Sequence, residues 1–542
     1  MKPASARGRL QVAAVFAAAL LVLSFNLWNT GIASGWIDPV LRLGAQDEAV
    51  YTHEAIRMIT HGDWLTPTLA GRWSFEKPPL LMWLSALSMK MFGIGPFTAR
   101  IPPVLAGALV AVLCFVAGRA ARSPAAGLGA ALLCVSSPLL FTMSRHNMTD
   151  ILLTASALGA FAAQALDPSL LRSRSRIAFT LAIAAGILTK SVAGLLPVFA
   201  ALLFAALSPH DTGARLRRVA VLSTCAVALA SPWFLYHLAI HREWFLADTG
   251  FQILTTGMRP HQTAPESHIS FYLSRLFYAA PVALILALTG IPAMMGALRR
   301  RADVPLLLVS NLLVLGLALM VFRFRSEQYL TPVVPLLALV AVISSPLFQR
   351  RFAPVVLAGI AVLSGVKVSN PGQPWGMSYR SGTTIPAAGM LSEYCEERRG
   401  NGLYILGVNE EFYALALPLA RVHYGWIDPD GIVEDGRPHL FYLGIIRHAG
   451  SPSHSSLYAE RLRAWGLDSS EPLGTAIVAR TAGELAVLVA EHPESDFLLS
   501  REVVEKLDQH TSHEIRRITP ELVLLYSKTK MPPVTPRWTC AM

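Results

Sequence analysis

The sequence contains few charged residues and few cysteines. Only 15% of its 542 residues are Asp, Glu, Lys or Arg, whereas 53% are hydrophobic and the mean hydropathy is +0.46. Soluble globular domains carry about 25% charged residues, so this composition places most of the chain in lipid. The five cysteines include no C-x-x-C pair, and their odd number and spacing indicate neither a disulfide framework nor a zinc site.

The formal net charge of +11 comes from short basic clusters between apolar runs, not from one basic stripe or tail. Such clusters are typical of membrane topology signals, so we expect contact with membrane lipid and no nucleic-acid partner. The apolar run at about 12–28 follows Lys2, Arg7 and Arg9 and fits either a signal peptide or a first transmembrane helix. Its length and the lack of a clean small-x-small cleavage site favour the helix.

Apolar runs long enough to cross about 30 Å of hydrocarbon recur along the first two thirds of the chain. The run at 77–92 is shorter, begins with Pro78 and Pro79, and contains Lys90, so we interpret it as a helix at the membrane interface. The sequence thus predicts a polytopic α-helical membrane protein with about 11 to 13 transmembrane helices. We place the crossings near 11–29, 101–118, 124–143, 150–167, 177–189, 191–208, 218–239, 272–297, 304–322, 330–347 and 353–367.

Arginine clusters test this assignment, because short cytoplasmic loops are rich in Lys and Arg. With the N-terminus inside, every predicted inner loop is basic; counting 77–92 as a crossing would move all the later clusters outside. The orientation therefore places a first loop of about 30–100 on the outer face. The inner clusters are Arg119 and Arg122; Arg172, Arg174 and Arg176; Arg215, Arg217 and Arg218; Arg299, Arg300 and Arg301; and Arg350 and Arg351.

After about residue 368 the composition becomes mixed, polar and charged. Strand-like and helix-like runs alternate there, which predicts a soluble α/β domain over 368–542 on the outer side, after a transmembrane domain over 1–367. The expected strands are 403–407, 440–445 and 496–499, and the expected helices are 410–419, 482–491 and 501–508.

Charged residues that are hard to explain structurally fall in the predicted outer loops. Acidic residues at the mouths of two helices, faced by cations, suit a site that binds a metal or an activated hydroxyl beside a phosphate. Singly, each has a structural explanation: Asp47-Glu48 or Asp150 as helix caps and Lys190 as a snorkelling lysine. Together they favour function, because charge at the edge of an apolar bundle is costly. The set comprises Asp47, Glu48, Glu76, Lys77, Asp150, Lys190, Arg259 and Arg325.

Around these residues the sequence resembles the polyprenyl-phosphate-sugar glycosyltransferases of the GT-C class. It is most similar to the bacterial 4-amino-4-deoxy-L-arabinose transferases that modify lipid A, which are related to protein O-mannosyltransferases. The matching motifs run in family order over roughly 40–340. They are Asp47-Glu48 with Tyr51; Gly62-Asp63-Trp64; Phe75-Glu76-Lys77-Pro78-Pro79 with Trp83; Arg100; Asp150; Leu188-Thr189-Lys190; Pro232-Trp233; and Tyr329-Leu330-Thr331-Pro332 with Pro335.

The resemblance implies an enzyme of the bacterial inner membrane that moves a sugar from undecaprenyl phosphate to lipid A or another envelope acceptor at the periplasmic face, inverting the anomeric centre. It implies catalytic roles for Asp47, Glu48 and Asp150. A divalent cation, if one is used, would lie between Asp47 and Asp150; no other cofactor is expected. The residues implied in substrate binding are Tyr51, Glu76, Lys77, Lys190, Arg259, Arg325 and Tyr329.

Two positions depart from the family pattern: Arg325 replaces a lysine four residues before the tyrosine, and Ser191 replaces a glycine after Lys190. Two other functions stay open. One is transfer of mannose to protein or of sugars to another envelope glycan. The other is a lipid or solute transporter, against which the predicted helices carry no charge near their middle and show no repeated half.

The orientation can be tested with reporter fusions. A reporter fused after Arg176 or Arg301 is expected to be active only in the cytoplasm, because both positions follow basic clusters. One fused after Gly400 is expected to be active only in the periplasm. A periplasmic signal from the Arg301 fusion would overturn the assignment of the acidic residues to the outer face.

Overall fold

The computed structural model describes the helical part of the chain and parts of the region after it. The predicted segments 410–419 and 440–445, all of 353–367 except residue 359, and most of 501–508 lie outside the described residues, as does Arg259. The described residues are 6–24, 45–69, 72–94, 96–209, 211–242, 245–246, 249–250, 267–322, 325–348, 359, 403–406, 422–427, 477–479, 482–491, 493, 496–500, 504–505, 513–517 and 522–528.

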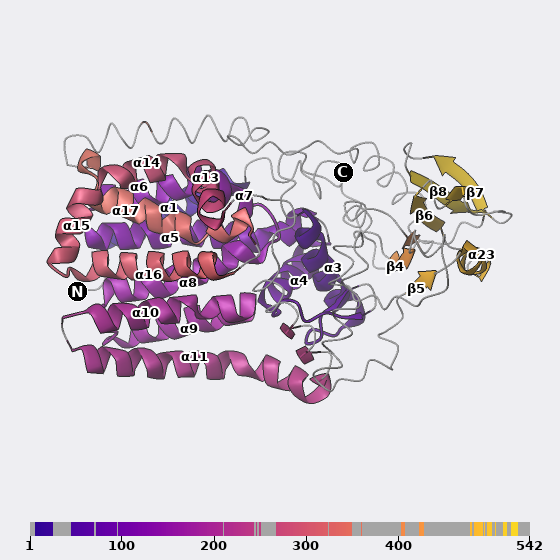
Figure 1. Cartoon of the computed structure of the whole chain (residues 1–542), viewed down its shortest axis with the longest axis horizontal. Coiled ribbons are helices and arrows are strands. Elements are labelled where there is room, and N and C mark those ends of the chain that lie inside the picture. Colours follow the sequence, from indigo (N-terminus) through magenta and orange to yellow (C-terminus); the bar gives the residue numbers. More distant parts are fainter. Residues whose placement is uncertain are drawn as a thin grey trace.

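Helices lie side by side in a bundle (Figure 1), and each predicted crossing up to residue 347 has a helical counterpart. Among the described residues, six helices are long and apolar enough to cross a membrane, or seven if one bent pair is a single span. The bundle consists of α1 (Ala6–Ser24), α5 (Pro96–Ala121), α6 (Pro124–Ser136), α7 (Pro138–Met143), α8 (Thr149–Leu166), α9 (Ser173–Lys190), η1 (Ser191–Leu195), α10 (Leu196–Leu207), α11 (Thr212–Ile240), α13 (His268–Ala279), α14 (Pro281–Thr289), α15 (Ile291–Arg299), α16 (Asp303–Val321), η2 (Glu327–Leu330) and α17 (Val333–Ser344).

The crossing predicted at 272–297 is not one straight helix. It is divided into α13, α14 and α15, and the chain bends by 104° between α13 and α14. Pro281 begins α14, and because proline has no backbone N–H it cannot continue the hydrogen bonding of α13. The Ser137 hydroxyl donates to the Ala279 carbonyl over 2.5 Å and so satisfies an acceptor at the break.

The two helices α3 (Ala45–His61) and α4 (Leu80–Phe92) lie at one end of the bundle, and α15 lies at the other (Figure 1). At 1.5 Å per residue, the 13 residues of α4 cover about 20 Å, too short to cross the hydrocarbon. The helix buries Leu81, Met82 and Met89 and contacts α3 and α5. This position agrees with the predicted interfacial segment.

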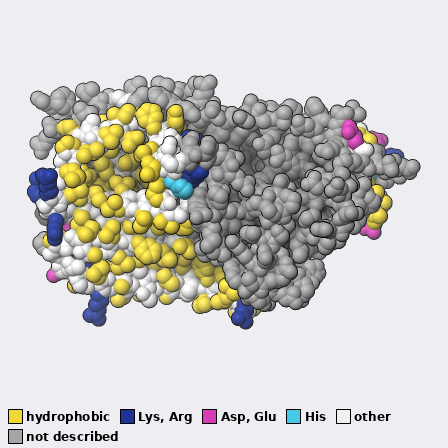
Figure 2. Space-filling view, viewed as in Figure 1, with side chains coloured by type: hydrophobic (Ala, Val, Ile, Leu, Met, Phe, Trp, Pro, Cys, Tyr) yellow, Lys and Arg dark blue, Asp and Glu magenta, His cyan; other side chains and the backbone are white. Residues whose placement is uncertain are grey.

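Figure 2 shows hydrophobic side chains over the visible face of the bundle, with Lys and Arg side chains at the end where α15 lies. The cluster Arg299, Arg300 and Arg301 is exposed. This cluster begins at the last residue of α15 and therefore lies at the end of the bundle opposite α3 and α4.

The described strands after residue 400 form a six-stranded sheet with the order β5-β4-β3-β6-β8-β7. The four strands β5, β4, β3 and β6 are parallel, and β8 and β7 are antiparallel additions. With helix α23 (Ala482–Glu491) this is the predicted α/β arrangement. The strands are β3 (Leu403–Leu406), β4 (Val422–Ile427), β5 (Ile477–Ala479), β6 (Asp496–Ser500), β7 (His513–Arg517) and β8 (Leu522–Ser527).

A tight turn joins α9 to η1 and carries Lys190. Gly194 lies so close to Gly186 that a side chain there would overlap the Gly186 backbone, which lets the two segments touch. Ser191, directly after Lys190, has φ +49° and ψ −120°, a conformation that glycine adopts far more readily. The residue at which the sequence departs from the family's glycine is therefore a strained one.

Replacing Ser191 by glycine is expected to stabilise the protein by about 1 kcal/mol, because the Cβ that causes the strain is removed. The measurement is the apparent midpoint of thermal unfolding of the full chain in detergent. Ser191→Ala is the matched control: it keeps the Cβ and should leave the midpoint unchanged. Equal midpoints for the glycine and alanine variants would show that the turn is not strained.

Candidate active site

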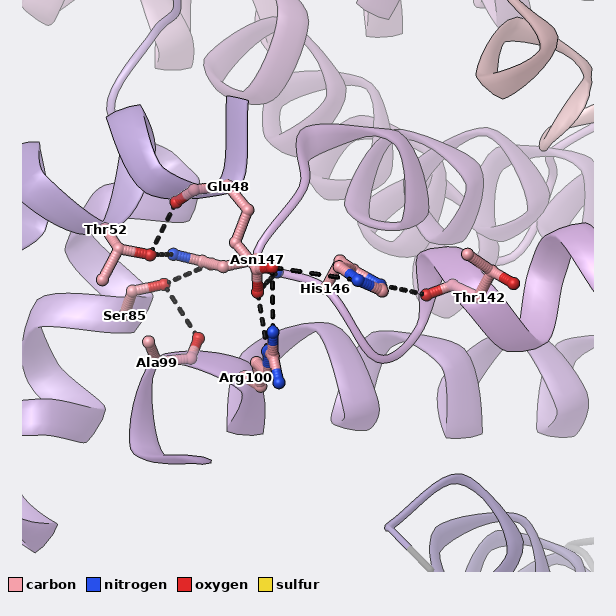
Figure 3. Close-up of polar contacts among 8 residues, drawn as sticks. All are labelled: Glu48, Thr52, Ser85, Ala99, Arg100, Thr142, His146 and Asn147. Atoms are coloured by element: carbon pink, nitrogen blue, oxygen red, sulfur yellow. Dashed lines mark hydrogen bonds and ion pairs between the residues drawn. The ribbon is translucent and has the colours of Figure 1, made fainter. Parts of the chain in front are cut away.

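A buried ion pair joins α3 to α5 (Figure 3). The Arg100 guanidinium donates to both carboxylate oxygens of Glu48, with Nε–Oε1 2.7 Å and Nη2–Oε2 3.0 Å. Both residues are 1% exposed. Two parallel N–H···O bonds to a carboxylate are the strongest form of this pairing, so the contact fixes direction as well as distance.

Asn147, in the connection between α7 and α8, extends this pair to two further elements (Figure 3). Its backbone N–H donates to Glu48 Oε1 over 2.9 Å. Its side-chain amide donates to Thr52 Oγ1 of α3 over 3.0 Å and accepts from Ser85 Oγ of α4 over 2.8 Å. Asn147 has no exposed surface. Because every polar group in the network has a partner, α3, α4, α5 and the start of α8 are held in one arrangement.

The surroundings of Glu48 lower the pKa of its carboxyl group. Burial alone would raise that pKa, but Arg100, the nearby His146 and the Asn147 N–H favour the ionised form and outweigh burial. His146 Nε2 lies 3.9 Å from Oε2. The carboxylate is therefore ionised and fully engaged with protein groups, which favours a positioning role for Glu48 over direct contact with a substrate.

A second ion pair joins α8 to α9. The Lys190 ammonium donates to Asp150 Oδ1 over 2.7 Å, and the two side chains are 15% and 3% exposed. The same ammonium lies 4.9 Å from the ring centroid of Tyr329 in η2, close enough for a cation–π interaction. Three residues that lie far apart in the sequence thus meet at one place.

Neither structural explanation for this pair matches its contacts. Met148 occupies the N-cap position of α8, and Asp150 is in its first turn without capping the helix. Lys190 pairs with a buried carboxylate, which a lysine snorkelling to water would not do. Asp150 and Lys190 therefore remain candidates for the predicted site.

The element that carries Tyr329 also brings Arg325 to this region. Arg325 is 6% exposed, and its guanidinium carbon lies 5.5 Å from the ring centroid of Phe271 in α13. The helices α7 and α13 both contact η2. A guanidinium over an aromatic ring keeps its positive charge, so Arg325 is a candidate for binding an anion.

The loop that carries Glu76 and Lys77 is anchored on α11. The Trp233 and His237 rings both donate to the Leu65 carbonyl over 2.9 Å, and Phe75 lies against both rings. Glu76 and Lys77 are half-buried directly before α4, with Lys77 Nζ 3.4 Å from the Glu76 carbonyl oxygen. The anchor therefore holds these two residues at the same end of the bundle as α3.

The structure groups the predicted site residues unequally. Asp150, Lys190 and Tyr329 are in contact, and Tyr51 is buried in the core on the same helix as Glu48. Asp47 lies on α3, but its side chain is outside what the structure describes, as is Arg259. The proposed metal between Asp47 and Asp150 therefore stays a prediction; within the described residues, no group of three His, Cys, Asp or Glu side chains could hold a metal ion.

Two residues important to the geometry were not predicted as site residues: Arg100 and Asn147. Arg100 is one of the matching family motifs but has no role assigned by them, and Asn147 is a neutral residue that no motif includes. The available signal was an arginine directly before the apolar run at 101–118, because a buried arginine requires an acidic partner.

Residues 76–236 match the family described as dolichyl-phosphate-mannose-protein mannosyltransferase. Over 195 residues the chain is 34% identical to the undecaprenyl phosphate-alpha-4-amino-4-deoxy-L-arabinose arabinosyl transferase of Pseudomonas aeruginosa, strain UCBPP-PA14, which is 34% of each chain. It is 30% identical to a transferase of the same description from Sodalis glossinidius over 35% of each chain. The chain thus matches about a third of the length of these relatives.

Two crystal structures of ArnT from Cupriavidus metallidurans have a similar fold. The form bound to undecaprenyl phosphate superposes with a TM-score of 0.67 at 16% identity, covering 96% of this chain and 99% of that one. The apo form gives 0.65 at 17% identity, covering 95% and 97%. The predicted fold, a GT-C type polytopic membrane bundle, is confirmed by this likeness.

Glu48→Gln is expected to destabilise the chain by about 3–5 kcal/mol, because it leaves the buried Arg100 charge without a counter-charge. The measurement is thermal unfolding in detergent across pH. The folded-state pKa of Glu48 is lowered, so its contribution to stability is full above its ordinary pKa and is lost as pH falls through the folded value. The difference in unfolding midpoint between wild type and Glu48→Gln should therefore become smaller as the pH falls into the acidic range.

The control replaces both partners. Glu48→Leu with Arg100→Leu removes the two charges together and should cost much less than the sum of the single replacements, because no uncompensated charge remains. Additive losses, or a Glu48→Gln variant as stable as wild type, would show that the pair does not hold α3 to α5.

Proposed function

We propose that the chain is an integral membrane glycosyltransferase that moves a sugar from an undecaprenyl-phosphate carrier to an acceptor at the periplasmic face of the bacterial inner membrane. The observation that carries this is the contact of Lys190 with Asp150 and Tyr329: a half-buried cation, a buried carboxylate and an aromatic ring at the edge of a membrane bundle. The partial match to transferases that use lipid-linked sugars supports it.

In this reaction the bond between the anomeric carbon and the phosphate oxygen breaks as an acceptor oxygen attacks that carbon from the opposite side. Negative charge accumulates on the departing phosphate. Cations fixed beside it stabilise the transition state more than the intact donor. Lys190 and Arg325 are held for this by Asp150 and Phe271, and we assign the same role to Lys77 and Arg259.

The acceptor decides whether a base is needed. A lipid A phosphate is already anionic near neutral pH and can attack without losing a proton. A hydroxyl acceptor must lose its proton, and Asp47, next to the fixed Glu48 on α3, is then the general base. We favour 4-amino-4-deoxy-L-arabinose and lipid A as the sugar and acceptor, because the relatives named for that transfer match this chain.

A second candidate is transfer of mannose to protein, which the match of residues 76–236 favours. It requires the same phosphate-binding cations and differs in the sugar and in the hydroxyl acceptor. Mass spectrometry of lipid A and of envelope glycoproteins from cells with and without the chain separates the two.

Lys190→Ala is expected to lower turnover by roughly 10²–10³-fold, the usual effect of removing one group that stabilises developing charge. Lys190→Arg should restore part of it, because a planar guanidinium does not replace a compact ammonium. The measurement is transfer from purified undecaprenyl-phosphate sugar to acceptor in detergent.

Lys90→Ala is the matched control. Lys90 also lies in the last turn of a helix, α4, and over an aromatic ring, 5.4 Å from the centroid of Trp64, but it is exposed and has no role in the proposed site. Its replacement should leave turnover at the wild-type level. Near-normal turnover in Lys190→Ala would remove Lys190 from the site.

A further inference from the structure

We propose that Thr149 and Asp150 together bind a hydrogen-bond-donating substituent, a hydroxyl or an ammonium group, on the sugar being transferred. The inference rests on the function proposed above. Thr149 and Asp150 open helix α8 and are 1% and 2% exposed. Lys190 occupies Asp150 Oδ1, whereas Asp150 Oδ2 and Thr149 Oγ1 are buried and have no hydrogen-bond partner among the described residues.

Other helical threonines show that this state is unusual. Thr52, Thr154 and Thr189 each donate their hydroxyl to the carbonyl four residues earlier on the same helix, over 2.7 Å. Thr149 is the first residue of α8, so no preceding turn offers it such a carbonyl. A buried polar group without a partner is destabilising, and two adjacent ones point to a ligand that satisfies them.

The chemistry of the two oxygens selects the ligand. A carboxylate oxygen only accepts hydrogen bonds, and a hydroxyl both donates and accepts. A sugar hydroxyl can donate to Asp150 and accept from Thr149, and an ammonium can donate to both. A phosphate fits poorly, because it has only acceptors to offer beside a carboxylate. The two carboxylate oxygens of Asp150 thus have different roles. Oδ1 positions Lys190 beside the donor phosphate, and Oδ2 accepts a hydrogen bond from the sugar.

The test uses the purified full chain and undecaprenyl-phosphate donors carrying 4-amino-4-deoxy-L-arabinose, intact or lacking the substituent at ring position 2, 3 or 4. For one of the three, kcat/KM should fall by at least about 10²-fold, because a site built to bind a polar group rejects an analogue without it. A loss at position 4 identifies the ammonium, and a loss at position 2 or 3 identifies a hydroxyl.

Variants of Thr149 connect that loss to the pair. Thr149→Val, similar in shape but without the hydroxyl, should lower the preference for the intact donor over that analogue by about 10-fold, the value of one hydrogen bond. Thr149→Ser should restore the preference. Thr154→Val is the matched control: it removes a buried hydroxyl of α8 that already bonds to the Asp150 carbonyl, and it should leave the preference at the wild-type value.

The outcomes separate the two proposals. Two results would show that Thr149 and Asp150 do not bind the sugar while leaving the glycosyltransferase function in place. The first is equal transfer by wild type of the intact donor and all three analogues. The second is a wild-type donor preference in a Thr149→Val variant that remains folded by size-exclusion chromatography. If wild type transfers no sugar from the intact donor, the proposed donor is wrong and this inference falls with it.

Discussion

The buried pair of Glu48 and Arg100 is the contact on which the rest of the site depends. It is bidentate, it has almost no contact with water, and through Asn147 it reaches the chain three residues before Asp150. The first turn of α8 is thereby fixed relative to α3 and α5. Asp150, in that first turn, fixes Lys190 through their ion pair. Lys190 is the last residue of α9 and is followed by the tight turn that the contact of Gly186 with Gly194 allows.

Two kinds of polar group lie close together at this end of the bundle. In the network around Asn147 each donor meets an acceptor, and such a network specifies one arrangement of its helices. At Thr149 and Asp150 two buried oxygens lack partners within the described part of the chain. The network around Asn147 makes this end of the bundle rigid, and the two unpaired oxygens of Thr149 and Asp150 can bind a ligand. The rigidity keeps these oxygens unpaired, because a more mobile helix α8 would rotate them toward other hydrogen-bond partners.

Much of the helical fold could be predicted, because the length of an apolar run and the arginines beside it report directly on membrane crossing. The interfacial segment at 77–92 and the short connection between the crossings at 177–189 and 191–208 followed from the same patterns. The role of Glu48 could not be predicted, since its partners lie 52 and 99 residues away and no local spacing encodes them. The bend at Ala279 was missed because hydropathy continues through it and only Pro281 marks it.

The distance in sequence between Glu48 and Asn147 also sets an order of events during synthesis. At about 5–20 residues per second, the 99 residues between them take roughly 5–20 s to emerge from the ribosome. Arg100 is made 52 residues after Glu48 and 47 residues before Asn147, so for roughly 2–9 s it has Glu48 as its counter-charge and lacks the Asn147 N–H. The segments up to α5 thus enter the membrane before the hydrogen bonds that fix their arrangement are complete. The α7–α8 connection, which carries Asn147, completes those hydrogen bonds when it is synthesised.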